Sequence, residues 1–327
     1  MRVSLVISTY NNPESLRKCL LGVCVQERPP DEIIVADDGS TDDTAAVLRR
    51  GEFSSLPIRH VWHADHGWRK SKVLNLAIAS STGDYVVFID GDCVPRRDYV
   101  ASHLRHARPR TFLSGNLVRV PAELHVSFTD DEILENAIFD SALLERRWPE
   151  AARYRRQLDP GWAEPLLNLL TWRYCVLMGG NCSAWRDDLV AVNGLDEGFA
   201  YGKEDRELGV RLRNSGVGSR WLKYSLILIH LDHPRTPVDL DRYREQRKRL
   251  RRLWFNGATW IEPGIETAFA RNDEKPATTH GLGRTGSPPT PEAVSGTIPR
   301  NQFATSIVWT CCSTMWWPHS HMQRPQL

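Results

Sequence analysis

The sequence has no excess of charge of one sign and no long apolar run. Its 327 residues carry 42 Lys and Arg against 40 Asp and Glu, a formal net charge of +2, so nothing global points to nucleic acid as a partner. No apolar stretch reaches the roughly 20 residues that a transmembrane helix needs. The first residues, MRVSLVISTY, become polar too soon for a signal peptide. These absences predict a cytoplasmic protein, at most peripheral to a membrane.

Cysteine is scarce and its spacing is uninformative. The seven cysteines are an odd number, and none of them form a CxxC pair or a zinc-like cluster. We interpret them as reduced thiols and not as a disulfide framework. The hydrophobic content of 41% and the charged content of 25% are ordinary for a globular protein.

The first 120 residues alternate short apolar runs with helical patterns. Asn12 is suited to cap a helix whose first turn contains Pro13. Loops this short between strands and helices favour βαβ units and an α/β fold with a mostly parallel central sheet flanked by helices. The strands are expected in residues 3–8, 31–40 (strand, then loop), 57–62 and 84–90, and the helices in 11–26, 41–50 and 69–80.

The second half has a weaker pattern. Residues 121–175 read as helical, two helices are expected at 186–192 and 203–215, and RWLKYSLILIHLDHP as a late pair of strands. After about residue 270 the composition becomes rich in Pro, Gly, Ser and Thr, which offers too little apolar surface for a core. Residues 272–327 are therefore predicted to form a disordered tail.

Polar residues follow three of the predicted strands directly. These stretches are Ser8 to Asn11, Asp37 to Ser40 and Asp90 to Asp92. In open α/β sheets, ligands bind beyond the carboxyl ends of the parallel strands. This edge of the sheet is therefore the predicted functional site.

Asp90, Gly91 and Asp92 place two carboxylates at the end of a buried strand. Carboxylate oxygens suit a hard divalent cation, Mg²⁺ or Mn²⁺, which would share its other positions with substrate phosphates. Taken alone, the motif also fits a simple turn. The run FIDGDCV further fits the haloacid-dehalogenase phosphatases, in which Asp90 would be a nucleophile. That motif normally ends the first strand of its domain, whereas three strand–helix units precede it here.

The stretch VADDGSTDD ends the second predicted strand. A carboxylate there could accept a hydrogen bond from a nucleobase N–H, while free loop amides take phosphate or ribose oxygens. The alternative is a turn in which Ser40 or Thr41 caps the next helix.

The ordered motifs STYN, DDGS, GWRKSKVLN and DGD resemble the inverting family 2 glycosyltransferases, whose nucleotide-diphospho-sugar transferase fold is called GT-A. The resemblance covers about residues 1–265 and continues in a galactosyltransferase-type second half, where Tyr201 replaces that family's usual Trp before Gly. GWRKSK resembles bacterial members that build lipopolysaccharide or other surface polysaccharides. The resemblance to the family implies a nucleotide-sugar-binding half at residues 1–120 and an acceptor-binding half at residues 121–265.

The resemblance implies a UDP-type nucleotide-sugar donor and a metal cofactor, Mn²⁺ or Mg²⁺. Asp90 and Asp92 would hold the ion and, through it, the diphosphate. Asp38 would contact the base, with Ser8 and Tyr10 lining the same pocket.

The helix in GWRKSKVLN would face the pyrophosphate. The resemblance gives this contact to Lys72 and Arg69, with Asn75 steadying the helix. The alternative is that these cations form only a solvated helix face.

On the acceptor side, the resemblance makes Asp205 the general base and gives Glu204 the task of orienting the acceptor. His230 or His233 would complete the metal shell. Two alternatives remain from the residues themselves: acids early in a helix simply favour its dipole, and a histidine in an apolar strand is often a core group. Because strand residues three apart face opposite sides, only one of the two histidines is expected to reach the ion.

The chemistry implied is a single displacement with inversion, onto a hydroxyl of a glycan or lipid-linked acceptor. Residues 241–255 pack seven Arg or Lys beside Leu, Trp and Phe, which suits either an anionic membrane leaflet or a solvated helix. The competing functions are the phosphatase and a non-catalytic module that binds sugar nucleotides.

Overall fold

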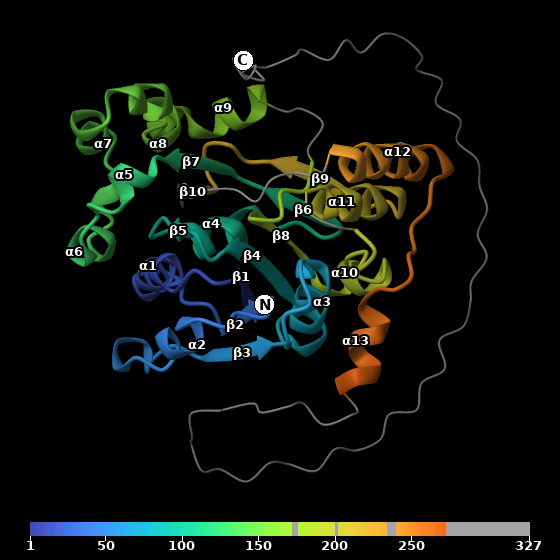
Figure 1. Cartoon of the computed structure of the whole chain (residues 1–327). Coiled ribbons are helices and arrows are strands. Elements are labelled where there is room, and N and C mark those ends of the chain that lie inside the picture. Colours follow the sequence, from blue (N-terminus) through green and yellow to red (C-terminus); the bar gives the residue numbers. More distant parts are fainter. Residues whose placement is uncertain (172–175, 200–201, 234–239, 273–327) are drawn as a thin grey trace, which may run out of the picture. The chain divides into compact units, whose positions relative to one another are not determined.

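The computed structural model describes residues 1–171, 176–199, 202–233 and 240–272 (Figure 1). Tyr201 and the predicted tail from residue 273 onward lie outside the described residues. The described residues fall within one compact unit, Met1–Leu282.

Ten strands form the framework of the described residues. They are β1 (Val3–Thr9), β2 (Glu32–Asp37), β3 (Ile58–Trp62), β4 (Tyr85–Asp90), β5 (Cys93–Pro95), β6 (Thr111–Ser114), β7 (Asn116–Val120), β8 (Asn181–Trp185), β9 (Gly218–Trp221) and β10 (Ile227–Leu231).

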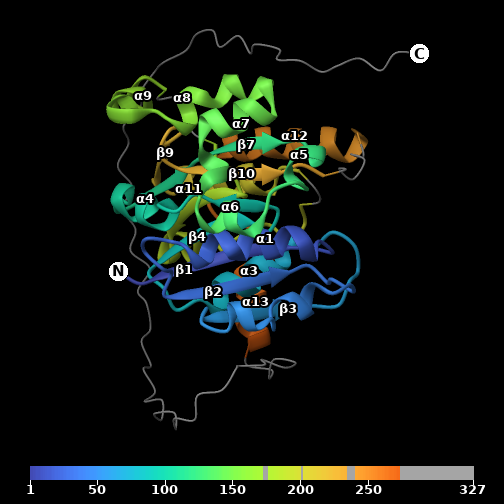
Figure 2. The same ribbon diagram turned by 90° about the vertical axis from the view of Figure 1, so that its left-hand side faces the viewer.

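Helices connect and cover these strands (Figure 2). The α-helices are α1 (Pro13–Cys24), α2 (Thr44–Val47), α3 (Lys70–Ser80), α4 (Tyr99–His106), α5 (Ala122–His125), α6 (Asp130–Leu134), α7 (Ser141–Arg147), α8 (Arg155–Leu158), α9 (Glu164–Leu170), α10 (Arg186–Ala191), α11 (Glu204–Asn214), α12 (Leu240–Asn256) and α13 (Ile265–Asn272). Four short 3₁₀ helices are η1 (Gly51–Phe53), η2 (Ala137–Phe139), η3 (Pro149–Tyr154) and η4 (Gly161–Ala163).

The main sheet has seven strands in the order β3-β2-β1-β4-β8-β6-β9. The first four pair in parallel, as the βαβ pattern predicts, whereas β8 runs antiparallel to both β4 and β6. A second sheet, β5-β10-β7, joins residues from both halves of the chain. The late strand pair is thus confirmed, but β9 and β10 lie in different sheets.

The first strand–helix unit forms as its residues suggest. Val3, Leu5 and Ile7 of β1 are buried, and α1 packs its apolar side against the same core cluster. The Asn12 side chain accepts a hydrogen bond from the Ser15 N–H, and Pro13 occupies the first turn of α1. The predicted cap is confirmed.

The helix after β2 is shorter than its pattern suggests, and its predicted cap is wrong. The N-cap of α2 is Asp43, whose side chain makes no capping hydrogen bond. Ser40 Oγ instead accepts from the Asn11 N–H at 2.8 Å, and Asn11 Oδ1 accepts from the Thr41 N–H at 2.9 Å. These side chains tie the loops after β1 and β2 together.

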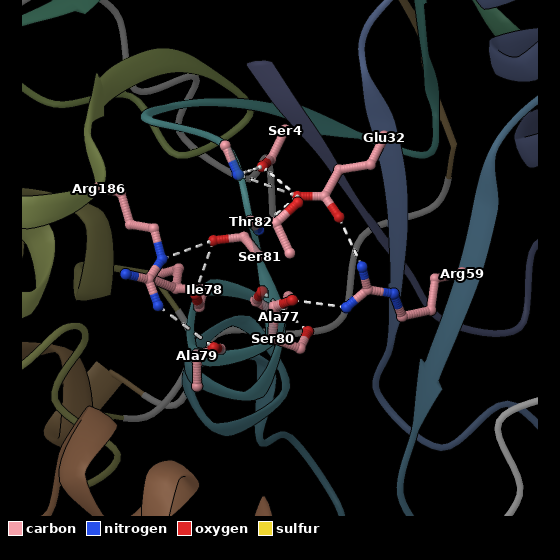
Figure 3. A network of polar contacts seen from close by, with 11 residues as sticks. Ser4, Glu32, Arg59, Ala77, Ile78, Ala79, Ser80, Ser81, Thr82 and Arg186 are labelled. Atoms are coloured by element: carbon pink, nitrogen blue, oxygen red, sulfur yellow. Dashed lines mark hydrogen bonds and ion pairs between the residues drawn. The ribbon is translucent and has the colours of Figure 1, made fainter. Parts of the chain in front are cut away.

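A buried carboxylate fastens the amino ends of the strands, opposite the predicted site. Glu32 accepts hydrogen bonds from Ser4 Oγ (2.6 Å), the Thr82 N–H (2.5 Å) and the Arg59 guanidinium (2.6 Å) (Figure 3). Burial raises the pKa of Glu32, but the hydrogen bonds from Ser4 and Thr82 outweigh it and lower the pKa below its ordinary value. This network fixes the register of three strands away from the polar edge.

Candidate active site

The carboxyl ends of β1, β2 and β4 meet at one edge of the sheet. Ser8 pairs in register with Asp90, and Thr9 with Asp37. The predicted convergence of the polar stretches at this edge is confirmed. The site is built from there.

Asp90 is held by two donors at its Oδ1 atom. Ser8 Oγ and Lys70 Nζ each lie 2.6 Å from it. Burial favours a neutral Lys70, but the carboxylates of Asp90 and Glu204 outweigh it and raise its pKa above the usual range. Lys70 therefore places a cation at this edge, a contact that the sequence did not predict.

Asp92, two residues after Asp90, faces two histidines. Asp92 Oδ2 lies 2.9 Å from His233 Nε2 and 3.5 Å from His230 Nε2. One ligand atom from each residue lies within 4.8 Å of the others, close enough to hold a single metal ion. The expectation that only one histidine reaches this point is wrong: β10 ends at Leu231, so strand alternation does not extend to His233.

Electrostatics in this cluster suit a metal ligand set. Burial raises the pKa of Asp92, but the hydrogen bond to His233 and the neighbouring His230 outweigh it and bring the pKa to about 2. Burial lowers the pKa of His230, which keeps its imidazole neutral near pH 7. An ionised carboxylate beside a neutral imidazole is the form in which both bind metals.

Asp90 does not belong to this ligand cluster. In the structure Asp90 contacts Lys70, whereas Asp92 contacts His230 and His233. The expectation that Asp90 and Asp92 share one ion stays a prediction.

The other predicted donor residues lie on the loops beside β1 and β2. Asp38 accepts from the Arg69 N–H at 3.0 Å, and its Oδ1 lies 3.1 Å from His63 Nε2. Tyr10 is 45% exposed and donates to Asp65 at 3.0 Å. These contacts join the loops that follow β1, β2 and β3 into one polar surface, the polar wall of the site.

Glycine at position 39 makes this wall possible. Gly39 has φ +98°, and a Cβ there would lie 2.7 Å from Asp65 Cα. The loop after β3 therefore packs directly on the turn after β2.

Asp37, to which the sequence assigned no role, stabilises this turn. Its carboxylate accepts a hydrogen bond from the Ser40 N–H at 2.8 Å and lies 2.9 Å from His60 Nε2.

Three further predicted residues lie on α3 or directly before it. The Arg69 guanidinium donates to the carbonyl of Ala64 at 2.7 Å, so it braces the loop and does not face Asp90. Asn75 is fully buried and exchanges hydrogen bonds with the backbone of Leu195, so it anchors a distant loop and does not line the site. Lys72 is half-buried on α3, next to but distinct from the lysine that reaches Asp90.

Asp205 approaches from the opposite half of the chain. It accepts from the Gly179 N–H at 3.1 Å and from the Arg206 N–H at 2.6 Å. Burial, and then the neighbouring Glu204 carboxylate, raise the pKa of Asp205 above its ordinary value despite these two donors. Glu204 is itself buried and accepts from the N–H groups of Gly202 and Lys203 at the start of α11.

Two consecutive glycines separate the two sets of carboxylates. A Cβ on Gly179 would lie 3.2 Å from Asp205 Cβ, and a Cβ on Gly180 would lie 2.2 Å from Asp90 Oδ2. The pair brings Asp90 and Asp205 to either side of one backbone segment. The two halves of the chain therefore supply one site.

Comparison with known families agrees with this geometry. Residues 4–155 match the model described as glycosyl transferase family 2, and residues 170–234 match the model described as the N-terminal domain of galactosyltransferase. Residues 4–155 therefore belong to glycosyltransferase family 2. The second match falls on the half that carries Asp205 and the two histidines, where a galactosyltransferase-type half was expected.

The curated relatives of this glycosyltransferase are named as glycosyltransferases or as polysaccharide synthases. The chain is 26% identical to the glycosyltransferase YfnE of Bacillus subtilis, over 75% of this chain and 68% of that protein. It is 28% identical to the chondroitin synthase of Escherichia coli, over 73% of this chain and 36% of that protein. The validoxylamine A glucosyltransferase of Streptomyces hygroscopicus is 28% identical, over 66% of this chain and 48% of that protein. The glycosyltransferase thus spans about a third to two thirds of these relatives' lengths.

Solved structures show the same fold. The mannosyltransferase PcManGT from Pyrobaculum calidifontis, in complex with GDP-Man and Mn²⁺, has a TM-score of 0.51 at 18% identity, over 84% of this chain and 73% of that chain. TarS of S. aureus in complex with UDP has a TM-score of 0.53 at 16% identity, over 83% and 70%. The predicted GT-A fold is confirmed.

The comparisons argue against two alternative functions. Asp90 ends the fourth strand of the segment that matches glycosyltransferase family 2, and not the first strand of its domain as in a dehalogenase-like phosphatase. The chain is also an enzyme and not a non-catalytic module. Within the described residues, no helix combines the length and apolar character that a membrane span requires.

Proposed function

We propose that this glycosyltransferase transfers a sugar, with inversion and with help from a divalent metal, from a UDP-linked donor to a hydroxyl of a glycan or glycolipid acceptor. The observation that carries the proposal is the pairing, across Gly179 and Gly180, of a cationic donor edge with a buried carboxylate of raised pKa. Its setting would be the synthesis of cell-surface polysaccharide or lipopolysaccharide, which the GWRKSK run favours.

Asp92, His230 and His233 would hold the ion. Two imidazoles and one carboxylate suit Mn²⁺ better than Mg²⁺, which prefers oxygen ligands. The solved mannosyltransferase with GDP-Man and Mn²⁺ supports this choice. When bound, the ion would neutralise the charge that develops on the leaving diphosphate.

Lys70 would supply fixed positive charge to the same diphosphate. Its ammonium lies among the carboxylates of Asp90, Asp92 and Glu204. A cation held ready at the leaving-group end stabilises developing negative charge without reorganisation. Asp90 orients this ammonium, and Asp38 with Tyr10 would contact the nucleoside.

Asp205 would take the proton of the acceptor hydroxyl. A pKa raised toward the working pH makes a carboxylate a better general base. Glu204, buried beside it, would orient the acceptor. Asp205 would act from the side of Gly179 and Gly180 that faces away from Asp90, as a single inverting displacement requires.

The function is tested by measuring thermal stabilisation by nucleotide sugars with and without Mn²⁺. We expect UDP-sugars with Mn²⁺ to raise the melting temperature, because a ligand that binds only the folded state stabilises it. Hydrolysis of the stabilising donor should then depend on the ion. Stabilisation by GDP-sugars alone would correct the nucleotide, and donor hydrolysis undiminished by a chelator would refute the role of the metal.

Lys70→Met should raise the KM for the donor by on the order of 10- to 100-fold, because a charged hydrogen-bond donor to the diphosphate is lost. Lys72→Met, on the same helix, should have a smaller effect. Donor KM values for both variants decide between the two lysines. A large effect at Lys72 with none at Lys70 would restore the sequence-based assignment.

The basic helix α12 is proposed to contact an anionic membrane. Phe255 is 80% exposed and Trp254 47% exposed, and Lys248, Arg251 and Arg252 line one depression with Phe255. Cations beside exposed aromatic rings suit an interfacial helix. A lipid-linked acceptor would make such a contact useful.

A further inference from the structure

A stripe of exposed apolar side chains runs along α9 and the turn before it. Trp162 is 92% exposed, Leu166 52%, Leu169 70% and Leu170 72%. At about 3.6 residues per turn, these positions fall on one face of the helix. Single exposed apolar residues are ordinary, but a contiguous group of four marks an interaction surface.

The opposite face of α9 is fixed by polar contacts. Asn168 Nδ2 donates to Ser225 Oγ at 2.7 Å, and Asn168 Oδ1 accepts from the Tyr224 N–H at 3.0 Å. Ser225 Oγ in turn donates to Glu164. These bonds hold Glu164 and Asn168 inward, so the apolar stripe is directed outward by the fold.

A basic cluster lies at the start of the same helix. His106 Nε2 is 4.0 Å from Glu164, and the charges of Arg105, Arg108 and Arg220 act on this histidine. Within the described ranges, none of the three guanidiniums forms a hydrogen bond or an ion pair with a carboxylate. Burial and the neighbouring Arg108 lower the pKa of Arg220, as expected for like charges without a counter-ion. The three guanidiniums are therefore left without a close ion pair within the described ranges, whereas His106 faces Glu164.

We propose that α9 docks on an anionic lipid leaflet. The Trp162 and leucine stripe would enter the boundary between headgroups and acyl chains, and the Arg105, Arg108 and Arg220 cluster would meet the lipid phosphates. The inference rests on the membrane contact proposed for α12 and adds to it the apolar anchor. In both views α9 and α12 lie toward the upper end of the molecule (Figures 1 and 2).

A second copy of the chain fits this surface less well. A stable interface buries about 800 Å² on each partner, which one two-turn helix does not supply. A two-fold dimer would also bring the same guanidinium cluster toward its own copy, because an isologous interface uses one patch twice. A lipid leaflet offers both the apolar depth and the negative charge.

The test is co-sedimentation of the full chain with vesicles of phosphatidylcholine, with and without phosphatidylglycerol. We expect binding that requires phosphatidylglycerol and weakens with salt. Leu169→Glu combined with Leu170→Glu should reduce binding by on the order of 10-fold or more, because both side chains would have to enter the interface. Val126→Glu, which changes an equally exposed residue (74%) at the end of α5, is the matched control and should bind normally.

Further variants separate the parts of the proposal. Arg105→Glu combined with Arg108→Glu should weaken binding to vesicles that contain phosphatidylglycerol by on the order of 10-fold. Arg251→Glu combined with Arg252→Glu tests the contribution of α12 on its own. Stabilisation by donor and Mn²⁺ shows that each variant is folded and separates a failure here from a failure of the proposed chemistry.

Three results would overturn the proposal. One is no binding of the full chain to either vesicle, and another is binding that the two leucine substitutions leave unchanged. The third is a self-association in sedimentation velocity that the leucine substitutions abolish, which would assign the stripe to a second copy.

Discussion

Asp205→Asn should lower kcat by on the order of 100-fold or more, with donor affinity nearly unchanged. The amide cannot accept the acceptor's proton, and general base catalysis is worth about 10²–10⁴ in rate. Asp205 lies across Gly179 and Gly180 from the donor edge, so its loss should not reach Lys70 or the histidines. The measurement is kcat together with donor affinity in the presence of Mn²⁺.

The same variant should be at least as stable as the wild type. A carboxyl whose pKa is raised by folding is destabilised when charged, so it weakens the fold as pH rises from its unfolded pKa toward its folded one. Near pH 7, removal of that charge should leave the melting temperature equal or higher. A merely structural acid at the start of α11 predicts the reverse, a loss of about 0.3–1 kcal/mol, because helix N-termini favour negative charge.

Two further variants complete this comparison. Glu204→Gln should act more on the acceptor KM than on kcat, since its role is to orient the acceptor. Asp187→Asn removes an exposed acid from the first turn of α10 and serves as the control for the helix dipole, with kinetics intact. If Asp205→Asn keeps its turnover and melts earlier, the general base is another group.

Asp92→Asn should nearly abolish turnover at limiting Mn²⁺ and weaken binding of the ion. Asp92 is the single carboxylate of the cluster, and both imidazoles face it. Loss of this charged ligand removes most of the electrostatic attraction at the site. Titration of Mn²⁺ by electron paramagnetic resonance, with turnover measured in parallel, checks both effects.

Asp90→Asn provides the contrast. Because Asp90 pairs with Lys70 and Ser8 and lies outside the ligand cluster, this variant should keep its Mn²⁺ affinity and lose donor affinity. Equal loss of Mn²⁺ affinity in both variants would restore the expectation that the two aspartates share the ion. Wild-type turnover of Asp92→Asn at limiting Mn²⁺ would remove the metal site altogether.

The donor half could be predicted from the sequence because its signals are local. Each strand is a short apolar run, and each polar stretch follows its strand directly, so parallel pairing brings Ser8, Asp37 and Asp90 to one edge. The antiparallel entry of β8 beside β4 could not be predicted in this way. It depends on a pairing between residues almost a hundred positions apart.

The sequence could not show which side chains face the site where this depends on the exact boundary of a helix or strand. In KSKVLN, whether Lys70 or Lys72 points inward depends on where α3 begins, and the structure begins it at Lys70. His233 reaches Asp92 because β10 stops two residues earlier. Neither boundary is marked by a proline, a glycine or a capping residue at that position.

The segment around Asp92 connects the two sheets. β4 of the large sheet ends at Asp90, and β5 of the small sheet begins at Cys93, which pairs with His230. An ion held by Asp92, His230 and His233 would therefore clasp the two sheets together. Since an ion that binds only the folded chain adds its binding free energy to folding, the stability of the folded enzyme would rise with the concentration of that ion.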